Sequence, residues 1–384
     1  MAKRTVHLHV GPAGAAADAI HGGLLEQRFA LSAAGFHVPA SSAYDALAIE
    51  IELCRTHREH GLRRSEVEGT WARLTREIWR SPRPALISIP GLAAAPPDGR
   101  ALVFDALAGL KIHLVLTPPD PGTALTTAWR SAVRTGRRTS FAKFARRALD
   151  AQRTHDYAQQ FHRTYDLTAL LDAWAPRMKP QRVHVLTAPP PGSNDSGGAA
   201  GPVAWRRYAA LLGLEPGDTP PAPIGALGAD EPIPAPDPRE IAAEVAVLRR
   251  VNRALDGRLN HPSYASVVAP LLGDLAPIAL PDLGPDPHTA PLRDVLNALG
   301  HTWVAEVAQR GHQLHGDPAD LLPLVPETAP HPDRVDAEEQ LGVATDLLAE
   351  ALLDLAELRR DLDRLSRAEG PGRRGLLRRR ALGA

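Results

Sequence analysis

The sequence predicts an α/β fold with a central parallel sheet, three layers deep, followed by a long C-terminal helix. Helical patterns alternate with short apolar runs, and this alternation indicates parallel strands with helices on both faces of the sheet. Leucine recurs at every seventh position near the C-terminus, which predicts the final helix. Four strands are expected, each bounded by proline or glycine: residues 6–10, 85–89, 112–117 and 182–187.

The first strand leads into a glycine turn and then a helix over residues 16–34, which Gly35 ends as a C-cap. Two later stretches, 188–201 and 215–238, are rich in proline, glycine or serine and are expected to be loops. Further helices are predicted at 44–60, 65–79, 123–135, 140–151, 167–174, 203–212, 239–255 and 291–312.

Composition excludes several classes of protein. Lys+Arg and Asp+Glu both number 44 in the 384 residues, so net charge does not favour a nucleic-acid partner. The single cysteine, Cys54, excludes an internal disulfide framework and a cysteine-rich zinc site. No apolar run approaches the roughly 18 residues of a membrane span. We find no secretory signal, and a cytoplasmic location is expected.

The turn after the first strand stands where many proteins hold a phosphate. In "VHLHVGPAGAAADA" a strand, a glycine turn and a helix start follow one another. A phosphate loop uses backbone N–H groups, the helix dipole and a lysine. The nucleotide triphosphatase pattern fails after Gly11, because Ala16, Ala17 and Asp18 replace its glycine, lysine and hydroxyl residue. His7 and His9 share one face of the strand, and packing is favoured over metal binding for both.

The surroundings of this turn resemble the P-loop sulfotransferase-like family, in particular an actinobacterial branch. Residues 8–11, "LHVG", residues 27–31, Gly35 and Pro39 follow that branch's opening strand, its "N-R-x-x-L-x-x-x-G" helix and its next strand without a gap. The resemblance covers about residues 4–325. Later segments keep the family's order and spacing: 85–98, 111–133, 163–192, 206–217 and 307–323.

The resemblance implies a P-loop sulfotransferase-like fold and transfer of a sulfuryl group from phosphoadenosine phosphosulfate to a hydroxyl or amine. Only the resemblance points to this cofactor. Gly14 stands at the family's lysine, and Pro118 and Pro119 stand where it has a phosphate-binding arginine. The implied cofactor site is a degenerate loop of Gly11, Pro12, Ala13, Gly14, Ala15, Ala16, Ala17 and Asp18. No catalytic residue and no metal ligand is predicted.

These losses should weaken cofactor binding, since a charged contact to a buried phosphate contributes on the order of 1.5–3 kcal/mol. We hypothesise that the Asp18 carboxylate caps the helix in place of the phosphate. Three functions stay open at this point. The chain is an impaired family member with an interaction role, an active sulfotransferase with an atypical loop, or an assembly protein that dimerises through its C-terminal helix.

Four regions are predicted along the chain. A sulfotransferase-like domain, 1–325, precedes a proline-rich linker, 326–333, a helix, 334–369, and a basic tail, 370–384, expected to be disordered. In the helix, apolar residues also recur three positions after each heptad leucine. Either the helix packs on its own domain, or it joins two subunits in a homodimer. The leucines of the stripe are Leu341, Leu348, Leu355 and Leu362.

Overall fold

The computed structural model describes residues 4–40, 42–191, 193, 200–214, 237–268, 290–324 and 330–368. The chain divides into two compact units, residues 1–335 and 336–384. Among the helices in these described ranges, none is both long and apolar enough to cross a membrane.

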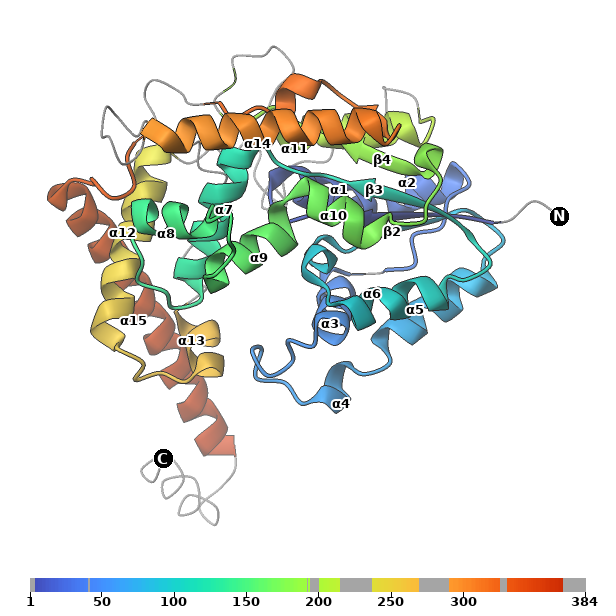
Figure 1. The fold of residues 1–384 in the computed structure, drawn as a ribbon. Coiled ribbons are helices and arrows are strands. Elements are labelled where there is room, and N and C mark those ends of the chain that lie inside the picture. Colours follow the sequence, from blue (N-terminus) through green and yellow to red (C-terminus); the bar gives the residue numbers. More distant parts are fainter. Residues whose placement is uncertain are drawn as a thin grey trace. The chain divides into compact units, whose positions relative to one another are not determined.

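The first unit is an α/β fold around a five-stranded, all-parallel sheet (Figure 1). The strand order is β2-β1-β3-β4-β5, so the first strand lies in the interior of the sheet. The four predicted strands are confirmed. The strands are β1 (Thr5–Val10), β2 (Ala85–Ser88), β3 (Lys111–Leu116), β4 (Val183–Leu186) and β5 (Gln313–His315).

Helices cover both faces of this sheet, because side chains alternate between the two faces along each strand. On one face, Leu8 of β1 and Leu116 of β3 belong to a large apolar cluster with Trp129 and Trp174. On the other face, Val115 belongs to a smaller cluster. Its helical members are Ile20, Leu24, Leu31, Ala204, Trp205 and Tyr208.

The helices follow the predicted pattern with some differences. The helix expected at 16–34 is interrupted at Gln27, and the helix expected at 65–79 is two pieces. Three helices that begin at Pro97, Asp156 and His261 were not predicted. The helices are α1 (Ala15–Glu26), α2 (Arg28–Ala33), α3 (Ala43–Cys54), α4 (Arg64–Val67), α5 (Thr70–Arg80), α6 (Pro97–Ala106), α7 (Pro121–Arg134), α8 (Phe141–Ala148), α9 (Asp156–Tyr165), α10 (Leu167–Trp174), α11 (Ala200–Leu211), α12 (Pro238–Leu255), α13 (His261–Val267) and α14 (Ala290–Gln309), with short 3-10 helices η1 (Pro90–Ala94), η2 (Pro180–Arg182) and η4 (Pro318–Leu321).

The second unit contains the predicted C-terminal helix, α15 (Ala337–Ala368). Asp333, near the end of the first unit, is bound to α8 and α12 of the same unit. Its carboxylate accepts the backbone N–H groups of Phe141 and Ala142, each at 2.9 Å, and pairs with Arg249 at 2.7 Å. The end of the predicted linker is therefore bound to the start of α8. Residues 326–329 of that linker and the predicted tail, 370–384, lie outside the described residues.

Candidate functional site

A small pocket, partly open to solvent, lies at the carboxyl edge of the sheet. This is the edge at which ligands bind in open parallel α/β sheets. The loops that follow β1, β3 and β4 line it, together with Ala200 at the start of α11. The lining residues are 12–17, 117–120, Thr123, Thr127, 188–191 and Ala200.

Most of the predicted loop lines this pocket, but its two end residues do not. Gly11 lies beneath the loop, and a Cβ atom there would stand 2.4 Å from the Thr117 hydroxyl oxygen. The end of β1 therefore packs directly on the end of β3. Asp18 lies in the first turn of α1, where the dipole favours a carboxylate, but its side chain is exposed and outside the pocket.

The carboxylate that does line the pocket is Asp120, which is only 3% exposed. It is the N-cap of α7, and its Oδ1 accepts the N–H groups of Gly122 at 2.8 Å and Thr123 at 3.0 Å. Burial raises the pKa of Asp120 to about 6, although these hydrogen bonds lower it. Asp120 was not predicted from the sequence as a site residue. The signal was an aspartate directly before a proline at a helix start.

The pocket offers hydroxyl and backbone groups but no cationic side chain among the lining residues that the structure describes. Apart from Asp120, they are alanine, glycine, proline and threonine. The three threonines are Thr117, Thr123 and Thr127. Such a lining can hydrogen-bond to a ligand, but it supplies no positive side-chain charge to a phosphate or sulfate.

His9 holds the floor of the pocket together. Its Nδ1 lies 2.7 Å from the Ser88 hydroxyl and its Nε2 lies 2.9 Å from the Thr117 hydroxyl. The three residues follow one another across β2, β1 and the end of β3. Burial lowers the pKa of His9 to about 3, so the imidazole is neutral at pH 7. Its position supports the packing role expected from the sequence.

Four further histidines form a row across the same face of the sheet, which we call the histidine ladder: His7, His113, His184 and His315. His113 Nδ1 lies 2.9 Å from His184 Nε2, and His184 Nδ1 lies 3.0 Å from His315 Nε2. The His7 ring stacks on that of His113 with centroids 5.1 Å apart. In the described part of the chain, no group of three or more His, Cys, Asp or Glu residues could hold a metal ion.

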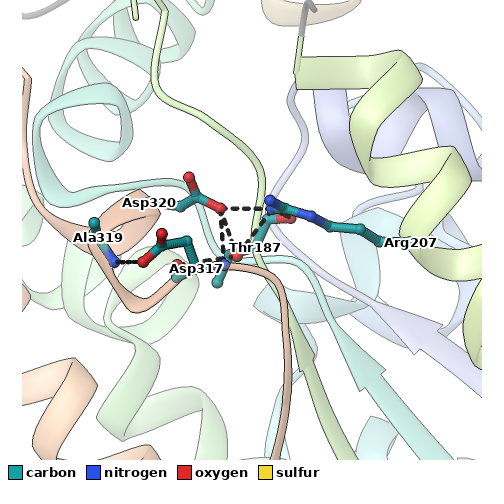
Figure 2. Close-up of polar contacts among 5 residues, drawn as sticks. All are labelled: Thr187, Arg207, Asp317, Ala319 and Asp320. Atoms are coloured by element: carbon teal, nitrogen blue, oxygen red, sulfur yellow. Dashed lines mark hydrogen bonds and ion pairs between the residues drawn. The ribbon is translucent and has the colours of Figure 1, made fainter. Parts of the chain in front are cut away.

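An ion pair supports the pocket wall that follows β4 (Figure 2). Arg207 Nη1 donates to the Thr187 carbonyl at 2.7 Å and to Asp320 Oδ2 at 2.5 Å. The Thr187 hydroxyl donates to the same Asp320 oxygen at 2.7 Å. We call these three residues the β4 clamp, because they tie the end of β4 to α11 and η4. The next residues, 188–191, line the pocket.

The turn before η4 fits tightly against this clamp. Gly316 has a φ angle of 129°, which side-chain-bearing residues rarely adopt, and a Cβ atom there would stand 2.2 Å from the Thr187 hydroxyl oxygen. Asp317 caps η4 by accepting the N–H of Ala319 at 2.8 Å (Figure 2). The "GDPAD" segment thus positions Asp320 for the ion pair.

No family model, curated protein or solved structure matches this chain.

Proposed function

We propose that the chain is a P-loop sulfotransferase-like protein that binds phosphoadenosine phosphosulfate weakly or not at all. In this proposal its function is an interaction with another molecule, and it does not transfer a sulfuryl group. The observation that carries this proposal is the charge of the pocket. Its described lining contains a buried carboxylate, Asp120, and no lysine, arginine or histidine. The family resemblance and the position of the loop between β1 and α1 support the assignment of the fold.

Sulfuryl transfer, like phosphoryl transfer, requires groups that stabilise negative charge as it develops on the leaving phosphate oxygen. Gly14 and Ala15 line the pocket where the resemblance expects a lysine and a hydroxyl residue. Backbone N–H groups remain at the start of α1, and they bind anions through partial charges only. A polyanionic cofactor would also be repelled by Asp120 above the pKa of this carboxyl group.

Calorimetry with phosphoadenosine phosphosulfate and with adenosine 3′,5′-bisphosphate tests this proposal. We expect no saturable binding of either nucleotide at pH 7.5, because no described side chain of the pocket pairs with their charges. The same samples should show no sulfuryl transfer to a panel of phenols, alcohols and amines. Micromolar binding of either nucleotide would contradict the proposal and favour an active sulfotransferase with an atypical loop.

A second candidate function is assembly through α15, for which the leucine stripe is the supporting observation. Leu348 is 60% exposed and Leu362 is 67% exposed. Leu358 and Leu365, three positions after heptad leucines, are also exposed. Exposed leucines at heptad spacing are typical of a helix that pairs with another helix. We propose a second copy of the chain as the partner.

Aspartate substitutions in the stripe test this assembly. The double variant L348D/L355D should convert a wild-type dimer to a monomer in light scattering after size-exclusion chromatography, because two charges per helix would be buried in the pair. The matched control is A349D/A356D, which adds the same charges at exposed positions beside the stripe. A monomeric wild-type protein, or dimers of both variants, would contradict the proposal.

A further inference from the structure

We propose that two copies of α15 pair in parallel and in register, so that Asp354 of each helix forms an ion pair with the partner's Arg359. This inference rests on the second candidate function, dimerisation through the leucine stripe, and adds the direction of the two helices. It is argued from the residues that flank the stripe, whose charges and apolar side chains complement each other only in the parallel pair.

The positions beside the stripe determine which residues of two paired helices meet. Leu348 and Leu355 are at heptad position a and Leu358 is at position d, so positions e and g lie at the edges of the contact. Asp354 is at position g, and Arg359 is at position e of the next heptad. In a parallel pair, each g residue faces the e residue of the next heptad on the other helix, and such pairs set the orientation of coiled coils.

Asp354 and Arg359 are therefore placed to form an ion pair between two parallel helices. The two-fold symmetry of such a dimer would form this pair once on each side of the contact. Both side chains are exposed in α15. Their spacing does not suit an ion pair within one helix, because such pairs join residues one turn apart. The spacing suits a second helix instead.

The heptad before this ion pair repeats the match with apolar residues. Leu347 is at position g and Leu352 is at the next position e, so these two leucines also meet in a parallel pair. Leu352 is 57% exposed in the single chain, and Leu347 is half-buried. They flank Ala351 at position d, where two alanines alone would bury little apolar surface. The leucine pairs widen the contact at this level.

An antiparallel pair would bring unlike residues together at the same positions. In it, g residues face g residues, and full overlap of the stripes, with Leu348 opposite the partner's Leu358, places Asp354 opposite the partner's Asp354. The same register places Leu347 opposite the partner's Asp361. Two carboxylates repel each other, and a leucine gains no apolar contact from a carboxylate. The flanking residues therefore favour the parallel pair.

Charge reversal in the full-length chain tests this orientation. D354R should raise the dissociation constant of the dimer on the order of tenfold in sedimentation equilibrium at low salt, because two arginines would then meet on each side of the contact. R359D should weaken the dimer similarly, and D354R/R359D should restore the wild-type affinity. The matched control is D346R, the same substitution at an exposed f position away from the stripe, which should leave the affinity unchanged.

The antiparallel pair predicts a different result for D354R. There the substitution would exchange a contact of two aspartates for a contact of two arginines, so the affinity would change little. An unchanged dissociation constant for D354R, or a D354R/R359D variant as weak as either single variant, would overturn the inference.

Disulfide trapping gives a second readout of the orientation. In a C54S background, which removes the chain's single cysteine, A344C should form a cross-linked dimer under mild oxidation, because parallel helices in register place both d residues at one level. A cross-link that forms only when A344C is mixed with L362C would show antiparallel helices and overturn the inference. A monomeric wild type would overturn the proposed dimer as well, whereas a wild-type dimer that fails these tests would overturn the orientation alone.

Discussion

Lowering the pH from 6.5 to 4.5 should strongly destabilise this protein, because it buries neutral histidines. Burial lowers the pKa of His9 to about 3 and that of His184 to about 4. The unfolded chain binds protons at these side chains below about pH 6.5, whereas the folded chain does not. Each such histidine reduces the free energy of unfolding by about 1.4 kcal/mol per pH unit, so the two together remove about 5 kcal/mol over this range.

Two features modify this pH dependence. The histidine ladder adds to it, because protonating one imidazole disfavours protonation of its neighbours, and Lys111 and Arg182 nearby act in the same direction. Asp120 acts in the opposite direction. Its folded pKa is raised, so its contribution to stability increases as the pH falls through about 6. The net effect should still be a loss, since several histidines oppose one carboxyl group.

Urea unfolding at a series of pH values between 4.5 and 8 measures this effect. Below pH 6.5 the H184Q variant should lose unfolding free energy less steeply than the wild type. The difference in slope should be about 1.4 kcal/mol per pH unit, the contribution of one histidine. The control is H301Q, at an exposed position of α14, which should keep the wild-type slope. A wild-type stability that stays constant between pH 6.5 and 4.5 would contradict the prediction.

The D320A substitution should destabilise the protein by about 2–4 kcal/mol, since it leaves Arg207 without its carboxylate and the Thr187 hydroxyl without its acceptor. The side chain of Asp320 is 7% exposed and that of Arg207 is 26% exposed, so the loss of unfolding free energy should be smaller than for a fully buried pair. Urea unfolding at pH 7.5 measures the change. D320N should lose less unfolding free energy than D320A, because its amide oxygen can still accept the hydrogen bond from the Thr187 hydroxyl.

An exposed ion pair provides the matched control for this substitution. Asp172 pairs with Arg310 at 2.7 Å, but its side chain is 65% exposed. The D172A variant should therefore change the free energy of unfolding by less than about 1 kcal/mol. If D320A were no more destabilising than D172A, the β4 clamp would not be a significant source of stability.

The sequence predicted the sheet well where its strands are buried apolar runs, and poorly where they are not. β1 to β4 are short, mostly buried runs rich in valine, leucine and isoleucine, and all four were predicted. β5 has only three residues, Gln313, Leu314 and His315, and its side chains are exposed or half-buried. Pairing with β4 holds it in the sheet, and no local pattern expresses that contact.

Only the position of the loop after the first strand could be predicted from the sequence. The side chains that shape the candidate site could not. A loop between the first strand and the first helix must lie at the carboxyl edge of a parallel sheet, and residues 12–17 of the predicted loop 11–18 line a pocket there. Asp120 was missed because "TPPDPG" is typical of a loop, and nothing local shows that its aspartate is buried. The β4 clamp was missed because Thr187 and Asp320 are 133 positions apart in the chain.

Gly11 shows that the two sides of one loop are under different packing constraints. The Thr117 hydroxyl, itself held by His9, leaves no room for a side chain at position 11. Any substitution there would disturb the junction of β1 and β3, whether or not the pocket holds a ligand. The residues that face the pocket are under no such restriction. Packing beneath the loop therefore requires a glycine at this position, whether or not a phosphate binds above it.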